Sequence, residues 1–124
     1  MNKFIFENLD VYQKAIEFGN RVFETTKNFN QKIQFSLGDQ LRRSALSISS
    51  NIAEGAGRKH KKEKKQFFQT ALSSAFECVP QLKIALLQAE IDQEQFSSLY
   101  EACFVISKML SSLIKSVDIL NLEK

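Results

Sequence analysis

The sequence predicts an all-α protein, an antiparallel up-down four-helix bundle formed by a single domain over residues 1–124. Apolar residues recur at spacings of three and four in four separate segments, which is the period of amphipathic helices. Pro (1) and Gly (4) are scarce, and Val/Ile/Thr-rich alternating runs typical of strands are missing. A chain of 124 residues can also bury a core without metal or disulfide support.

The first expected helix runs from about Asn8, as its N-cap, to about Asn28. Residues 1–8 precede it as a short arm, which Phe4 and Phe6 are expected to dock onto the bundle. The expected apolar face of this helix comprises Leu9, Tyr12, Ile16, Gly19, Phe23 and Thr26.

The second expected helix starts near Ser36, which approximates a capping box with Asp39. Gly55 and Gly57 are expected to end it, because glycine adopts left-handed backbone at low cost. Its predicted apolar face comprises Leu37, Leu41, Ala45, Ile48 and Ile52.

The third expected helix begins between Arg58 and Lys62 and ends at about Glu90. Pro80 lies inside it, and we expect a kink there and not a break, because the apolar period continues across the proline. One stripe comprises Phe68, Leu72, Ala75, Val79, Leu82, Leu86 and Ala89. A second stripe beside it comprises Phe67, Ala71, Ser74, Cys78 and Ala85.

The fourth expected helix opens at Asp92, an N-cap with Gln95 at the reciprocal capping-box position. Its seam comprises Phe96, Leu99, Cys103, Ile106, Leu110, Leu113, Val117 and Leu120. Further apolar residues outside that seam are Tyr100, Phe104, Met109 and Ile114. The extra apolar surface on the last two helices favours an oligomer interface. A wide apolar stripe within a monomer is the alternative.

Positive charge is concentrated in one segment. The net charge is +3, but residues 58–65, RKHKKEKK, carry +5, so the remaining residues sum to −2. Such a cluster would bind phosphates in a salt-sensitive, sequence-independent way. A solvated helix end is the simpler explanation of the same residues.

The residues that carry chemistry argue against an enzyme, a metal site or a cofactor. The single histidine, His60, lies in the lysine run, which excludes a di-iron site built on Glu-x-x-His motifs. Cys78 and Cys103 fall on the heptad stripes and are expected to be core residues in a reducing cytoplasm. We expect no signal peptide and no membrane span.

Residues 40–58, QLRRSALSISSNIAEGAGR, mix a clean apolar face with small polar residues. Small side chains allow close approach of helices or subunits. The expected packing and interface residues are Gln40, Ser47, Ser50, Asn51, Glu54, Gly55 and Gly57. Glu54 with Arg42, Arg43 or Arg58 is a conceivable acid–base set, but an ion-pair cluster that fixes helix packing is the preferred interpretation.

This stretch, followed by KKEKKQFF and ALSSAFE, resembles the four-helix bundle proteins encoded in intervening sequences of bacterial large-subunit ribosomal RNA genes. The segments LDVYQKAIEF and ISKMLSSLIKS extend the resemblance over nearly the whole chain. It implies a homopentameric ring. It is also similar to accessory proteins of diversity-generating retroelements, pentameric barrels that bind nucleic acid and a reverse transcriptase. His60 replaces a common capping Ser, Lys64 replaces an aromatic residue, and Pro80 is unusual.

Together these features predict a non-enzymatic, pentameric, cytoplasmic bundle that binds RNA or DNA backbone. The alternative is a protein-interaction scaffold that recruits a partner protein, with the basic charge incidental. The predicted nucleic-acid-binding residues are Arg42, Arg43, Arg58, Lys59, Lys61, Lys62, Lys64 and Lys65.

Overall fold

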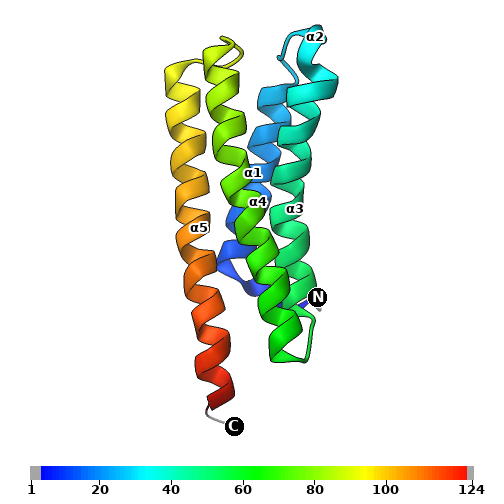
Figure 1. Ribbon diagram of the computed structural model, residues 1–124, viewed down its shortest axis with the longest axis vertical. Coiled ribbons are helices and arrows are strands. Elements are labelled where there is room, and N and C mark those ends of the chain that lie inside the picture. Colours follow the sequence, from blue (N-terminus) through cyan, green and yellow to red (C-terminus); the bar gives the residue numbers. More distant parts are fainter. Residues whose placement is uncertain (1–3, 123–124) are drawn as a thin grey trace.

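The computed structural model describes residues 4–122 and is a four-helix bundle of up-down-up-down topology (Figure 1), so the predicted fold class is confirmed. Around the core, α1 lies beside α3, α3 beside α4, α4 beside α5, and α5 beside α1. The lower end of the bundle in Figure 1 holds the start of α1, the α3–α4 connection and the end of α5. The four long helices are α1 (Asp10–Thr26), α3 (Asp39–Ala56), α4 (Lys61–Leu87) and α5 (Gln93–Leu122).

The face that α1 buries differs from the predicted one by a rotation of about one residue. Ile16 and Phe23, expected in the core, are 44% and 41% exposed. Two apolar stripes lie side by side on this helix, and the prediction favoured the stripe with the larger side chains. The structure buries the stripe that contains small Ala15, because a small residue lets α1 approach its neighbours closely. The buried residues are Val11, Ala15, Phe18, Val22 and Thr26.

A short 3-10 helix, η1 (Ile5–Asn8), precedes α1, so Asn8 is not the N-cap. Phe6 docks this segment: its ring centroid lies 5.0 Å from that of Tyr12 in an edge-to-face arrangement. Phe4 stacks on Phe6 at 5.6 Å but remains exposed. The predicted arm is therefore attached through Phe6.

The α1–α3 connection is more helical than predicted. It consists of α2 (Gln31–Ile33) and a π-helical turn, η2 (Gln34–Gly38), which leads directly into α3. Asn30 caps α2 by accepting a 2.9 Å hydrogen bond from the backbone amide two residues on. Ser36 lies within the π turn and donates to a backbone carbonyl, so its predicted capping box with Asp39 is wrong.

The predicted core face of α3 is confirmed, with Leu41, Ala45, Ile48 and Ile52 fully buried. The reason given for the glycines is wrong: no described glycine has positive φ, and Gly57 has φ −83°. Gly55 is needed for space. A Cβ atom there would lie 2.6 Å from Cε1 of Phe68 in α4, closer than real contacts allow.

Helix α4 continues through Pro80, which rules out the break. It ends at Leu87, earlier than expected, and Ala89 adopts left-handed backbone with φ 60°. The second apolar stripe of this helix belongs to the core, which supports the wide-stripe explanation for α4. Its buried members are Ala71, Ser74, Cys78 and Ala85.

Helix α5 begins with the predicted capping box: Asp92 Oδ1 accepts from Gln95 N at 2.8 Å, and Gln95 Oε1 accepts from Asp92 N at 2.9 Å. The predicted seam faces the core, with Leu99, Cys103, Ile106, Leu110 and Val117 buried. Within residues 4–122, none of the helices combines the length and apolar character that a bilayer crossing requires.

Candidate nucleic-acid interface

The structure separates the predicted binding residues into two groups. Arg42 and Arg43 lie near the start of α3, at the upper end of the bundle. From Arg43 to the other group, α3 rises about 20 Å, at about 1.5 Å per residue. Within one chain the two groups therefore form no continuous patch. The lower basic cluster, at the α3–α4 connection and the first turns of α4, comprises Arg58, Lys59, Lys61, Lys62, Lys64 and Lys65.

Arg42 holds the α1–α3 connection in place. Its guanidinium donates to the Gln34 side-chain oxygen at 3.1 Å and to the Gln34 carbonyl at 2.8 Å. The Gln34 amide in turn donates to the carbonyls of Thr26 and Phe29 at 2.6 and 3.1 Å. Because its donors are engaged within the fold, Arg42 has a structural role. Arg43 instead forms an exposed ion pair one helical turn back along α3.

Lys64 joins two helices. Its ammonium donates to the carbonyls of Gly55 and Ala56 at 2.9 and 3.0 Å, which are unpaired carbonyls at the end of α3. It also lies 5.8 Å from the ring centroid of Phe68. Burial lowers the pKa of Lys64. A cation at a helix C-terminus complements the helix dipole, so Lys64 caps α3.

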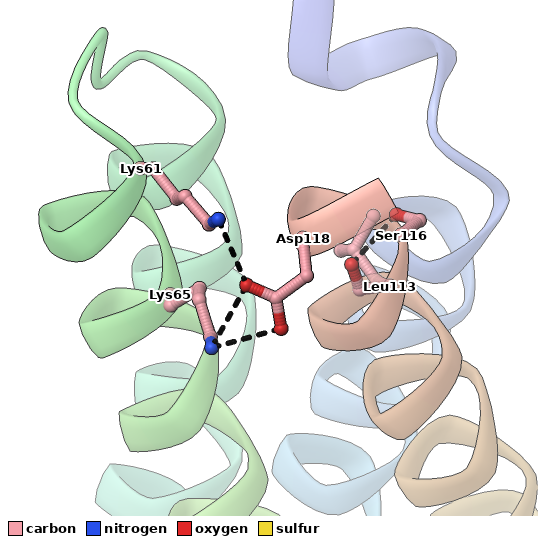
Figure 2. Close-up of polar contacts among 5 residues, drawn as sticks. All are labelled: Lys61, Lys65, Leu113, Ser116 and Asp118. Atoms are coloured by element: carbon pink, nitrogen blue, oxygen red, sulfur yellow. Dashed lines mark hydrogen bonds and ion pairs between the residues drawn. The ribbon is translucent and has the colours of Figure 1, made fainter. Parts of the chain in front are cut away.

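Lys61 and Lys65 converge on one carboxylate from α5 (Figure 2). Lys61 Nζ lies 3.3 Å from Asp118 Oδ1, and Lys65 Nζ lies 3.2 and 3.0 Å from the two Asp118 oxygens. The hydrogen bond from Lys65, followed by that from Lys61, lowers the pKa of Asp118. These contacts tie the last turns of α5 to the first turns of α4.

The remaining cations differ in their commitments. Arg58 pairs with Glu54 at 2.9 Å and stacks over the Phe67 ring at 4.8 Å. Of the proposed acid–base partners of Glu54, only Arg58 reaches it. Lys59 and Lys62 are exposed, and neither has an ion-pair or hydrogen-bonding partner within the part of the chain that the structure describes. They are the cations most available to a ligand.

A depression of about 290 Å³ opens among the lysines on the first turns of α4. It is lined by Lys61, Lys62, Lys65 and Gln69. The six cations of the lower basic cluster face three nearby acids, Glu54, Glu63 and Asp118. This end of the bundle therefore keeps a surplus of positive charge.

The small polar residues of the central stretch pack α3 against α4 within one chain. Ser47 Oγ lies 2.8 Å from Ser74 Oγ, and Asn51 donates to Ser47 Oγ at 3.0 Å. Gln40, Ser50, Glu54 and Gly57, by contrast, are exposed. Of the two explanations offered by the sequence, contact between helices accounts for the buried members.

Sequence reasoning missed an apolar groove between α4 and α5, of about 700 Å³. Its floor contains Phe76, Val79, Tyr100 and Phe104, and Lys108 lies at 5.5 Å from the Phe104 ring. Tyr100 and Phe104 were noted as apolar residues outside the seam. Phe76 was not, because it lies on neither stripe of α4. A large aromatic residue off the helical period is the signal that was available.

No catalytic or metal-binding arrangement is found among residues 4–122. These residues contain no cluster of three or more His, Cys, Asp or Glu side chains. Cys78 and Cys103 are free and fully buried, and the Cys103 thiol donates to the Ala75 carbonyl at 3.1 Å. The hydrogen bond with Cys103, together with burial, raises the pKa of Cys78. The Cys78 thiol therefore stays protonated and packs as a core residue.

Comparison with known proteins gives two matches. The family model described as 23S rRNA-intervening sequence protein matches residues 7–112. A crystal structure from Bacteroides thetaiotaomicron VPI-5482, of a protein of unknown function from the S23 ribosomal protein family, is 29% identical with a TM-score of 0.80. The alignment covers 85% of this chain and 98% of that one. No curated protein matches the chain.

Proposed function

Because the chain belongs to the 23S rRNA-intervening sequence protein family, we propose that it is a non-enzymatic, cytoplasmic bundle that binds RNA or DNA backbone. The observation that carries this proposal is the surplus of positive charge in the lower basic cluster, where Lys59 and Lys62 remain uncommitted. Lysine contacts to phosphates release counterions and carry no sequence information. Such binding would depend on salt and tolerate many sequences.

The geometry narrows the set of residues proposed to touch phosphate. Lys59 and Lys62 are free, and Lys61 and Lys65 border the depression on α4. Lys64 and Arg42 are excluded from the set, because each is committed to backbone carbonyls. Arg58 and Arg43 keep exposed faces and take secondary places.

We also propose that copies of the chain form a homopentameric ring. Support comes from two different exposed apolar surfaces, the α4–α5 groove around Phe104 and the outer face of α1 with Ile16 and Phe23. Contact between unlike surfaces is heterologous and can close into a ring. A ring would repeat the lower basic cluster around its axis and so raise avidity for a polyanion.

A charge reversal tests the nucleic-acid proposal. The double variant Lys59→Glu/Lys62→Glu alters two side chains that support no contact in the fold. Its binding to fluorescein-labelled 20-nucleotide RNA and DNA would be followed by anisotropy across a salt series. We expect weaker binding and a salt slope reduced by about two, since each lost phosphate contact removes about 0.9.

The matched control is Lys32→Glu/Lys83→Glu, which makes the same charge change at the upper end of the bundle. This control should bind nearly as the wild type does. If both double variants weaken binding equally, the effect is one of net charge and the lower basic cluster is not the site. If the wild-type protein ignores both probes even at low salt, the proposed function is wrong.

The α4–α5 groove favours a second candidate function, a scaffold that recruits a partner protein. An apolar groove with basic residues at its rim suits a protein surface as well as a neighbouring copy. This candidate gains if the purified protein binds neither nucleic-acid probe at low salt and forms a stoichiometric complex with one protein. Loss of that complex in Phe104→Glu would place it in the groove.

A further inference from the structure

Two lysines on α4 and one carboxylate on α5 form an arrangement that a phosphate could also satisfy. Lys61 and Lys65 are one helical turn apart and direct their ammonium groups to the same point (Figure 2). Asp118 occupies that point with both carboxylate oxygens, at 3.0 to 3.3 Å from the lysine nitrogens. Carboxylate and phosphate oxygens accept the same charged hydrogen bonds from ammonium groups.

The same two lysines line the depression on α4 together with Lys62 and Gln69. Lys62 is free of internal partners among the described residues, and Gln69 adds an amide donor. The depression thus offers three ammonium groups and one amide to an anion. Two of those ammonium groups are shared with Asp118.

We propose that this depression is a phosphate subsite for the nucleic-acid backbone, and that Asp118 is an internal competitor that occupies its two shared lysines in the free protein. This inference rests on the proposed function and names how that same site is regulated. Binding would exchange one internal carboxylate for a phosphate of the ligand. Asp118 would therefore weaken binding and raise the threshold for weakly charged anions.

The exchange is feasible because the internal contact is not deeply buried. The Asp118 side chain is 45% exposed, and Lys61 is 40% exposed. Ion pairs with this exposure are individually weak. A polyanion brings several phosphates and releases counterions at each one, so it can displace a single carboxylate. The part of α5 that carries Asp118 also projects past the neighbouring helices (Figure 1).

The variant Asp118→Asn tests the inference with the same fluorescein-labelled RNA and DNA probes. An amide keeps the size of the side chain but no longer competes as an anion. We expect affinity about three- to tenfold higher at about 0.1 M salt, and a salt slope steeper by about one to two as Lys61 and Lys65 engage phosphates. Circular dichroism would verify that the variant folds.

Two controls isolate the proposed mechanism. Asp39→Asn removes the same charge and frees Arg43 at the opposite end of the bundle. It should not reproduce the gain. In a Lys61→Gln/Lys65→Gln background, the further change Asp118→Asn should have no effect, because the two lysines through which it acts are gone.

The outcomes separate the inference from the proposed function. Wild-type binding with no gain in Asp118→Asn overturns the inference alone. An equal gain in Asp39→Asn also overturns it, since the effect would then follow net charge. If neither the wild type nor Asp118→Asn binds either probe, the proposed function is wrong and the inference falls with it.

Discussion

At the scale of single residues, the lower basic cluster contains lysines with opposite roles. Lys64 caps α3 through two backbone carbonyls, whereas Lys62, two residues earlier, extends into solvent. The sequence places both in one RKHKKEKK run and assigns both to binding. Periodicity alone could not separate them, because the difference depends on where the end of α3 lies relative to α4.

This difference predicts unequal effects on stability. Lys64→Met should lower the free energy of unfolding by about 1–3 kcal/mol, because two carbonyls at the end of α3 lose a charged donor. Lys62→Met keeps the same change of side chain at an exposed position and should stay within about 0.5 kcal/mol of wild type. Urea denaturation followed by circular dichroism measures both. Equal effects would contradict the capping role of Lys64.

At the scale of elements, sequence periodicity predicted which segments are helical better than it predicted their faces. The cores of α3 and α5 were predicted correctly because each has one dominant apolar stripe. On α1 two stripes compete, and the choice of Ile16 over Ala15 was wrong, since packing distance depends on the neighbouring helices. The π-helical turn before α3 was also not predicted; it is held by the Arg42–Gln34 contacts across the connection.

The α3–α4 contact gives a prediction of its own. Gly55→Ala should destabilise the protein by about 1–2 kcal/mol: the new Cβ meets the buried Phe68 ring, and overpacking of about 1–3 kcal/mol exceeds the gain of about 1 kcal/mol in helix propensity. Gly57→Ala is the matched control. Its nearest atoms lie 3.7 Å away and its φ of −83° suits alanine, so it should be neutral or slightly stabilising. Thermal and urea unfolding would test the pair, and a stabilising Gly55→Ala would contradict close packing.

At the scale of the whole molecule, the four-helix topology followed from the helix lengths and short connections, because antiparallel neighbours are the simplest way to bury four apolar faces. The candidate site followed only in part. The basic run was evident, but its division into capping, paired and free lysines depends on Gly55, Asp118 and other residues distant in sequence. The separation of Arg42 from that run reflects the length of α3, which places its two ends at opposite ends of the bundle.

The proposed ring predicts a particle about five times the 14.2 kDa mass of the chain. Phe104 is 48% exposed in the α4–α5 groove, so Phe104→Glu should preserve the fold of one chain while placing a charge at the proposed contact. Size exclusion coupled to light scattering should then show smaller species, with unchanged helix content. Leu46→Glu makes the same kind of change at a 55% exposed residue of α3 outside the groove and should leave the assembly intact. A monomeric wild type would contradict the ring, and an intact pentamer in Phe104→Glu would move the contact to another surface.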